Sequence, residues 1–418
     1  MPQTSETKLE IEGKETLLNS EADTKLKEAR MTETVKGCKD FLGEDARKRE
    51  LIKDILIRKF KLYGFEPAET PILEYEEFVR GENQNDEAVS DIFKLQDRGE
   101  RKLALRYELT FQLKRIAQNK KLPYKRYQIG EVFRDEPTGS NRFRQFTQCD
   151  IDIIGSTIKD EAEILAMTSS LLKELGIKST INFNNRKLLN EILDKEGIKN
   201  KEQVIKEIDK LDKLTEKEVK DNLKKYKAEK LVQIFKKPEF FFEKYDAYKE
   251  IKELKDYCKE YNVAVNFLPS LARGLSYYNG TVFEIKTQDV KETITAGGSY
   301  LVNGVQSTGI SFGLNRLYSL AKINASEKRI LIISIGQDEK SIKLSENLRE
   351  NNIPCLIMYN KVSKALEFAN SYALPYVIFL GADEAKKKKV KLRDMKSGKE
   401  EMVSEKDLIN KLGKQSTA

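Results

Sequence analysis

The chain has 418 residues, of which 39% are hydrophobic and 34% charged, and 76 basic against 68 acidic side chains leave a net charge of +8 at pH 7. This length allows about two or three domains, and Leu, Ile, Val and Phe recur too regularly for a disordered chain. No apolar run approaches the ~20 residues that a membrane span needs, and the absence of histidine excludes catalytic triads and histidine-ligated metals.

The N-terminal part of the sequence predicts an extension followed by a helix. Residues 1–33 mix acidic residues with lysines and contain no apolar stretch, so we expect a polar extension rather than a secretory signal. Apolar residues between Ala46 and Phe60 recur near helical spacing, which predicts a helix that ends by Gly64.

The next part of the sequence predicts mainly strands. Residues 70–73 and 102–107 read as extended segments, and Thr110 is expected to cap a short helix that follows. Residues 124–155 predict two strands, joined by a loop over residues 135–144 that is rich in Gly, Ser, Asn and Arg.

A change of composition marks residues 186–260, which are dense in Lys, Glu and Leu and predict consecutive short helices. Strand-like sequence returns at residues 281–285. A Gly-rich turn is expected at residues 296–298 and an apolar helix near residues 313–320.

A second domain is expected from Lys328. Its predicted strands and helices alternate along the chain: strands at 330–335, 353–358 and 376–380, with helices around 344–348 and at 361–373. This alternation predicts a mainly parallel sheet, and the absence of GxGxxG and P-loop motifs leaves nucleotide binding there unsupported. Residues 386–399 hold eight basic residues and one acid, which fits an exposed hairpin and phosphate contact equally well.

Two segments concentrate polar side chains. Read as one strand, residues 142–152 place these residues on one face: Arg142, Arg144, Phe146, Gln148, Asp150 and Asp152. The opposite face is mostly apolar, so the polar face predicts a binding site, with a solvated, salt-bridged surface as the alternative. Residues 272–281 set Arg273 beside Gly274 and pair two tyrosines, a weaker signal that a Gly-flanked turn would also explain.

Together these segments resemble the histidyl-tRNA synthetase family of class II aminoacyl-tRNA synthetases. The matching segments are Phe133–Glu136 with Arg142–Phe146 (motif 2), Thr70–Glu74 (motif 1), Gly309–Leu317 (motif 3) and Arg273–Gly280 (the family's signature peptide). Gln148–Asp152 is closer to the archaeal and eukaryotic branch than to the bacterial one. The resemblance runs from about residue 35 to the C-terminus.

The resemblance implies an α+β fold with a class II antiparallel sheet flanked by helices. It implies a catalytic domain over residues 34–325, with residues 186–260 as a helical insertion. Residues 328–418 would form an α/β anticodon-binding domain, and residues 1–33 would remain an extension. Class II relatives form homodimers, so a two-fold symmetric dimer is expected.

The implied function is that of a histidine–tRNA ligase. Such an enzyme activates L-histidine with ATP and Mg²⁺ to histidyl-adenylate, then transfers histidine to the 3′ end of tRNA(His). The histidine carboxylate attacks phosphorus already ionised, so no base is needed, which fits a chain without histidine. By resemblance Arg134 and Arg273 are catalytic, and these residues bind ATP: Arg134, Glu136, Arg142, Arg273 and Arg316.

The resemblance also assigns the histidine site. Around the amino group it places Glu108, Leu109, Thr110 and Gln148. Around the imidazole ring it places Asp152, Tyr277, Tyr278 and Tyr300. A buried acid on the ring can reject isosteres that lack an N–H. No metal is expected to be bound by the protein itself. Four cysteines without a CxxC pair add no zinc signal and indicate a reducing, cytoplasmic setting.

Four residues depart from the family pattern: Ser276, Asn315, Ser299 and Tyr107, where many members have Asp, Glu, Arg and Pro. Ser276 could weaken the orientation of Arg273, although variation between lineages explains all four. Two alternative functions remain, a catalytically silent regulatory subunit of histidine biosynthesis and a tRNA-binding module. The retained substrate residues and the C-terminal domain favour the enzyme.

Overall fold

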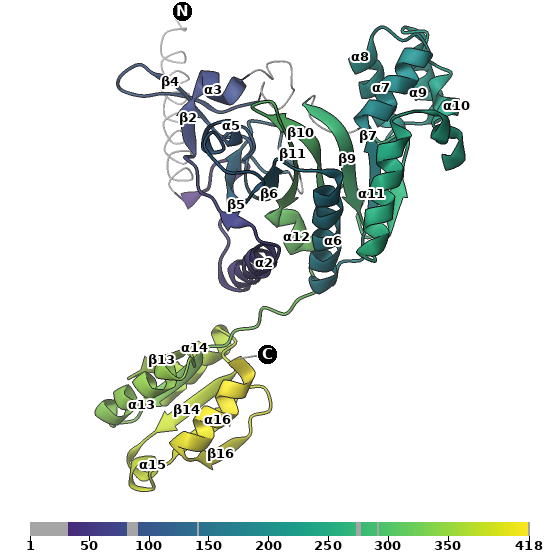
Figure 1. Cartoon of the computed structure of the whole chain (residues 1–418). Helices are drawn as coiled ribbons and strands as arrows, with labels where there is room; N and C mark the ends of the chain where they lie inside the picture. The colour runs from purple at the N-terminus through teal and green to yellow at the C-terminus, as the bar shows by residue number, and fades with distance from the viewer. Residues whose placement is uncertain (1–31, 82–90, 140–141, 273–276, 291, 417–418) are drawn as a thin grey trace, which may run out of the picture. The chain divides into compact units, whose positions relative to one another are not determined.

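The computed structural model describes residues 32–81, 91–139, 142–272, 277–290 and 292–416, and the chain divides into one unit up to residue 323 and another from residue 324 (Figure 1). Most of the predicted N-terminal extension, residues 1–31, lies outside the described residues. Within the described ranges, no helix combines the length and the apolar character that crossing a membrane requires.

An eight-stranded sheet forms the centre of the first unit. Its strands, in spatial order, are β1 (Glu66–Pro67), β5 (Tyr124–Phe133), β6 (Gln145–Ile154), β11 (Val305–Gly313), β10 (Thr295–Val302), β9 (Tyr278–Lys286), β7 (Thr180–Asn185) and β8 (Val265–Phe267). The pairs β1–β5 and β7–β8 at the two edges are parallel, and all the pairs between them are antiparallel. Beside it lies a smaller antiparallel sheet of β2 (Leu73–Tyr75), β4 (Lys102–Leu105) and β3 (Lys94–Gln96).

Helices cover the apolar face of the large sheet. They are α2 (Gly43–Leu62), α6 (Ile158–Glu174) and α12 (Leu314–Leu320), with α11 (Tyr248–Glu260) packed beside α6 (Figure 1). Ile52, Leu56 and Phe60 recur at four-residue spacing on α2 and are buried in one core with Ile151 and Ile153 of β6. An antiparallel-rich sheet flanked by helices confirms the predicted α+β class.

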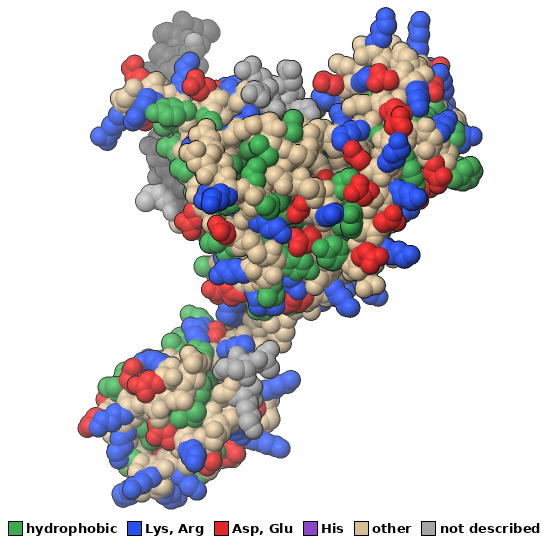
Figure 2. All heavy atoms as spheres, viewed as in Figure 1, with side chains coloured by type: hydrophobic (Ala, Val, Ile, Leu, Met, Phe, Trp, Pro, Cys, Tyr) green, Lys and Arg blue, Asp and Glu red, His purple; other side chains and the backbone are tan. Residues whose placement is uncertain are grey.

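The predicted helical stretch consists of short helices. They are α7 (Arg186–Lys195), α8 (Lys201–Ile208), η1 (Asp209–Asp212), α9 (Glu216–Lys224), α10 (Leu231–Ile234) and η2 (Glu239–Lys244), and they lead into α11. Thr215 and Glu218 start α9 with a reciprocal capping box, in which the Glu218 carboxylate accepts from the Thr215 backbone N–H at 2.8 Å. Figure 2 shows Lys and Arg side chains interspersed with Asp and Glu over these helices, so the face in view carries mixed charge.

Three local predictions were wrong. The Gly-rich segment at residues 296–298 lies inside β10 and is not a turn. Gly297 is needed there because a Cβ would overlap the Gly309 carbonyl oxygen and come within 2.6 Å of the Phe283 ring. Glycine therefore permits close packing of strands here. Thr110 does not cap the short helix α5 (Leu113–Ile116), whose N-cap position is Gln112.

The third correction concerns the polar strand. β6 begins at Gln145, so Arg142 and Arg144 belong to the preceding loop and do not share its face. Asp150 and Asp152 do share that face, and each is only 3% exposed, which excludes a solvated surface.

The second unit is an α/β sandwich around a five-stranded sheet. In spatial order its strands are β13 (Cys355–Met358), β12 (Ile330–Ser334), β14 (Tyr376–Leu380), β15 (Val390–Asp394) and β16 (Glu400–Val403). Its helices are α13 (Asp338–Glu350), α14 (Val362–Ser371), α15 (Ala382–Lys386) and α16 (Glu405–Ser416). The pairs β12–β13 and β12–β14 are parallel, whereas β15 and β16 add two antiparallel pairs that the alternation rule did not predict.

Alternating residues of β12 face two separate cores in this unit. Ile330 and Ile332 pack with residues of α13 and α16, and Leu331 and Ile333 pack with α14. Helices therefore cover both faces of the sheet. The basic run at residues 386–399 spans the end of α15, β15 and the turn to β16, so it does include a hairpin.

Candidate active site

The polar side of the large sheet faces away from the α2–α6 core. Register across β5 and β6 places Arg126 opposite Asp152, Gln128 opposite Asp150, and Gly130 opposite Gln148. Side chains alternate between the two faces along a strand, so the residues next to these polar ones point into the core while the polar side chains share the opposite face. This polar face of the sheet is therefore both buried and charged.

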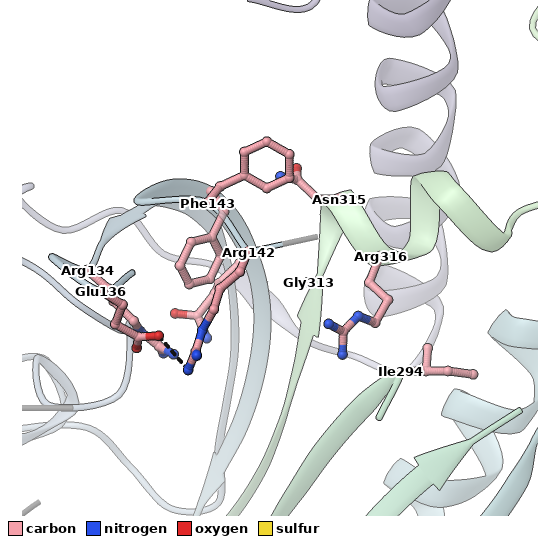
Figure 3. Close-up of a pocket in the computed structure, with 10 residues that line it drawn as sticks. Arg134, Glu136, Arg142, Phe143, Ile294, Gly313, Asn315 and Arg316 are labelled. Carbon is pink, nitrogen blue, oxygen red and sulfur yellow. Dashed lines mark ion pairs between the residues drawn. The ribbon is translucent and has the colours of Figure 1, made fainter. Parts of the chain in front are cut away.

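At one end of this polar face lies a cavity of about 280 Å³. Six polar residues line it: Arg134, Glu136, Arg142, Gln148, Asn315 and Arg316. Figure 3 shows Arg134, Glu136 and Arg142 on one side of the space, and Arg316 projecting into it from α12 on the other side.

Arg134 is held from two directions. Its Nε donates to the Tyr107 carbonyl oxygen at 3.1 Å, and its guanidinium lies 5.1 Å from the centre of the Phe146 ring. Beside it, Arg142 Nη2 pairs with Glu136 Oε2 at 2.7 Å, although the Arg142 side chain is 67% exposed. An ion pair so exposed contributes little stability, which leaves the Arg142 cation available to a ligand.

The opposite wall is fixed by backbone and amide contacts. Arg316 Nη1 donates to the Thr293 carbonyl oxygen, and burial lowers the pKa of Arg316. Asn315 accepts from Arg49 Nη1, while Arg49 Nη2 donates to Thr147 at 3.1 Å. The amide of Asn315 is therefore used to hold a buried arginine.

Three guanidinium groups and one carboxylate around a small cavity favour an anionic ligand. Arginine forks match phosphate and carboxylate oxygens well, and the partly water-excluded setting strengthens the attraction. Within the described ranges, no group of three or more Cys, Asp or Glu side chains is arranged to hold a metal ion.

A second, larger cavity of about 780 Å³ lies along the same sheet. Tyr107, Glu108, Thr110, Tyr277 and Tyr300 are among its lining residues, and Glu108 is only 6% exposed. A buried carboxylate at a cavity wall is suited to an ammonium group.

Asp152 is the centre of the polar network beside this cavity. Its Oδ1 accepts a hydrogen bond from the Tyr300 hydroxyl, and its Oδ2 lies 2.7 Å from Nη2 of the fully buried Arg126. Burial raises the pKa of Asp152, and Arg126 and Tyr300 oppose that rise.

Asp150 continues the network toward the smaller cavity. Ser311 donates to Asp150 Oδ1 at 2.5 Å and accepts from Gln148 Nε2 at 2.7 Å. Burial raises the pKa of Asp150 to about 7, with Arg126 lowering it and Asp152 raising it. Hydrogen bonds therefore join Asp150 through Ser311 to Gln148, which lines the smaller cavity, while Arg126 interacts electrostatically with both Asp150 and Asp152.

Three tyrosines pack against one another over this network. The ring centroids of Tyr277 and Tyr278 are 4.8 Å apart, and those of Tyr277 and Tyr300 are 5.4 Å apart in an edge-on arrangement. Burial raises the pKa of all three phenols, so they remain neutral donors at pH 7.

The structure groups most of the predicted site residues around these two cavities. Arg134, Glu136, Arg142, Gln148 and Arg316 line the smaller cavity, and Glu108, Thr110, Tyr277 and Tyr300 line the larger. Leu109 has a fully buried side chain, but its carbonyl oxygen accepts from Arg126 at 2.6 Å. Arg273 and Ser276 lie outside the described residues.

Sequence reasoning missed four contributors: Arg126, Asp150 (noted only as part of a polar face), Ser311 and Arg49. A signal existed for Arg126, because it is the one cation on the face of β5 that also bears Gln128 and Gly130. A charged residue on the buried side of a predicted strand needs a buried partner.

Comparison with known proteins gives a consistent result. Residues 37–317 match the family model described as histidyl-tRNA synthetase, and residues 329–415 match the anticodon binding domain. Histidine–tRNA ligase 1 of Bacillus cereus is 35% identical over 415 residues, covering 88% of this chain and 96% of the relative.

Two solved structures are also similar. The histidyl-tRNA synthetase of Nostoc sp. PCC 7120 aligns with a TM-score of 0.81 at 25% identity, covering 92% of this chain and 99% of the other. A structure described as an ATP phosphoribosyltransferase regulatory subunit/histidyl-tRNA synthetase from Bacillus halodurans C has a TM-score of 0.70, covering 84% of this chain and 98% of the other; at 21% identity it shows the shared fold alone. These relatives are bacterial, so they do not support the predicted kinship with the archaeal and eukaryotic branch.

Proposed function

Because the chain belongs to the histidyl-tRNA synthetase family, we propose that the polar face of its large sheet is where histidine and ATP react. The protein is an aminoacyl-tRNA ligase that uses ATP to join histidine to tRNA. The observation that carries the proposed site is the set of buried polar residues on one face of the sheet, where Asp152 pairs with Arg126 and Asp150 is joined through Ser311 to Gln148, beside an acid-lined cavity and an arginine-lined one.

The smaller cavity is proposed to hold ATP. Arg134 approaches the α-phosphate, where negative charge builds as the histidine carboxylate attacks phosphorus. Arg316 and Arg142 bind the remaining phosphates and the nucleotide, and Glu136 serves the adenine end while orienting Arg142. The attacking carboxylate is already ionised, so positioning and fixed positive charge suffice.

The larger cavity is proposed to hold histidine. Glu108 and Thr110, which line this cavity, bind the ammonium group together with Gln148, which lines the smaller cavity. Asp152, Tyr278 and Tyr300 surround the imidazole ring, with Tyr277 packed behind them. Leu109 contributes through its carbonyl oxygen, which anchors Arg126.

Two assignments rest on the family resemblance. Arg273 is proposed as the second cation at the α-phosphate, although it lies outside the described residues. Mg²⁺ is proposed to arrive bound to ATP, since Glu136 is the one carboxylate among the described residues that line the smaller cavity. The ion would add positive charge at the phosphates.

Residues outside the cavities have proposed roles too. Residues 34–325 form the catalytic domain, with 186–260 as an inserted helical part, and residues 328–418 bind the anticodon of tRNA(His). We propose that the protein works as a homodimer in the cytoplasm. Residues 1–33 remain a polar extension.

The direct test is ATP–pyrophosphate exchange measured with each of the twenty amino acids. We expect exchange that depends on histidine alone. Absence of exchange in folded protein would favour the catalytically silent regulatory subunit or the tRNA-binding module instead. Exchange with another amino acid would show that the ring site was misassigned.

Arg134→Ala sharpens this test. We expect the exchange rate to fall by about 100-fold or more, as when one preorganised donor to a developing oxyanion is removed. Arg101→Ala is the control, because Arg101 pairs with Asp97 in an exposed turn and lines neither cavity. Equal rates for the two variants would remove Arg134 from the reaction.

A further inference from the structure

Arg126 is the largest side chain in the described structure that is fully buried. Burying a guanidinium is costly unless charge and hydrogen bonds compensate, so its partners indicate what its presence achieves. Both described partners, the Leu109 carbonyl oxygen and the Asp152 carboxylate, belong to the proposed histidine site.

A single nitrogen of Arg126 makes both contacts. Nη2 donates to the Leu109 carbonyl oxygen at 2.6 Å and lies 2.7 Å from Asp152 Oδ2. Leu109 stands between Glu108 and Thr110, which line the cavity on the proposed ammonium side, and Asp152 lies on the proposed ring side. The guanidinium therefore ties the two halves of the amino-acid site together.

Two further donors of Arg126 strengthen the case. Among the described residues, Nε and Nη1 are buried and have no protein hydrogen-bond partner. A residue serving stability alone would be expected to satisfy these groups, because each unsatisfied buried donor costs free energy. Their position beside Asp150 and Asp152 leaves them to a bound water or to the ligand.

We infer that Arg126 is a specificity-determining positioning residue, which fixes the span between the ammonium-binding segment and the ring-binding carboxylate of Asp152. This inference rests on the proposed function of the site. The Arg126 charge opposes the rise that burial causes in the pKa of Asp152 and so favours the carboxylate form, which can accept a hydrogen bond from a ring N–H. The bond to Leu109 sets how far that carboxylate stands from Glu108.

The test compares Arg126→Met with Arg126→Lys in histidine-dependent ATP–pyrophosphate exchange. We expect Arg126→Met to raise the KM for histidine roughly 10- to 100-fold, because Asp152 loses its buried partner. The KM for ATP should change less than about twofold, because Arg126 is not among the described residues that line the smaller cavity. The KM for histidine of Arg126→Lys should lie between those of wild type and Arg126→Met, since lysine keeps the positive charge but lacks the planar set of guanidinium N–H donors.

Two controls separate a positioning role from loss of structure. Lys59→Met removes a partly buried cation on α2, whose partners are Ser170 and Glu174, and should leave both KM values unchanged. Asp152→Asn should raise the KM for histidine by itself, and adding Arg126→Met to Asp152→Asn should then cost much less than it does in wild type.

Each outcome decides a different question. If the wild type shows no histidine-dependent exchange, the proposed function fails. If the wild type is active and Arg126→Met keeps its histidine KM, or raises both KM values in parallel, or acts additively with Asp152→Asn, the inference about Arg126 is wrong.

Discussion

Glu161 is a carboxyl group buried on the core side of the large sheet. It lies in the first turn of α6, is 5% exposed, and accepts a hydrogen bond from Ser299 of β10. Burial raises its pKa to about 7, and hydrogen bonds from Ser299 and Thr281 oppose the rise only in part. Ser299 stands where many family members have an arginine, so this acid faces a hydroxyl instead of a cation.

The raised pKa predicts a pH-dependent stability. The folded state binds the Glu161 proton more tightly than the unfolded state, whose carboxyl has an ordinary pKa near 4.5. The stabilising effect of that proton is therefore complete below about pH 4.5 and is lost as the pH rises through about 7.

Glu161→Gln should remove this dependence. Near pH 8 the variant should be more stable than wild type by up to about 3 kcal/mol, and near pH 5 the two should converge. Thermal unfolding between pH 5 and 8 measures the difference, and the absence of histidine keeps that window free of imidazole titration. A constant difference in Tm across the range would contradict the prediction.

At the level of single residues, the sequence predicted most of the residues that line the cavities but not Arg126, which holds site residues in place. Arg134, Glu136, Arg142 and Arg316 follow from motif resemblance and do line one cavity. Arg126 was missed, because its importance depends on the register that places it opposite Asp152. Register between strands is a tertiary property that no local pattern of residues reveals.

Among the elements, the interior strands β10 and β11 show how glycine shapes the site. A Cβ at Gly309 of β11 would overlap Asp152 Oδ1 and come within 2.7 Å of the Ile151 carbonyl oxygen. The missing side chain leaves room for the Asp152 carboxylate to lie flat against the neighbouring strand.

Gly309→Ala should therefore displace Asp152 while leaving the smaller cavity, which is proposed to hold ATP, in place. We expect the efficiency of exchange with limiting histidine to fall roughly 10- to 100-fold, with a smaller effect on the KM for ATP. Gly99→Ala is a suitable control, because the atoms nearest a Cβ there belong to the side chains of Asp97 and Arg101 at 3.4 Å or more. An unchanged KM for histidine in Gly309→Ala would show that Asp152 adapts.

Prediction of the elements succeeded where apolar periodicity is strong, and it failed for the Gly-rich segment, the Thr110 cap and the start of the polar strand. The helix predicted between Ala46 and Gly64 is present as α2, and the two strands predicted between residues 124 and 155 are present as β5 and β6. The prediction of a turn at Gly297 was wrong because glycine occurs both in turns and in tightly packed strands. Here the close neighbours of Gly297, which include the Phe283 ring, come from other strands and are not visible in the local sequence.

On the scale of the whole molecule, each of the two units has its own hydrophobic core. The first unit holds one large core behind the eight-stranded sheet, and the second has a core on each face of its five-stranded sheet. A unit with its own core can fold independently.

Separate expression of residues 1–323 and 324–418 tests this independence. We expect each fragment to unfold cooperatively, and the first to retain histidine-dependent exchange, since all the described residues that line the two cavities belong to it. Charging of tRNA should be lost or greatly weakened without the second fragment. Loss of exchange from a folded first fragment would show that the second unit contributes to activation.

The pocket around Asp152 lies in a chain that contains no imidazole of its own. In a complex with isotopically labelled substrate, every imidazole nitrogen resonance in an NMR spectrum would therefore come from the bound amino acid. The ligand would report its own tautomer and charge state, details that are ordinarily inferred from hydrogen-bond networks.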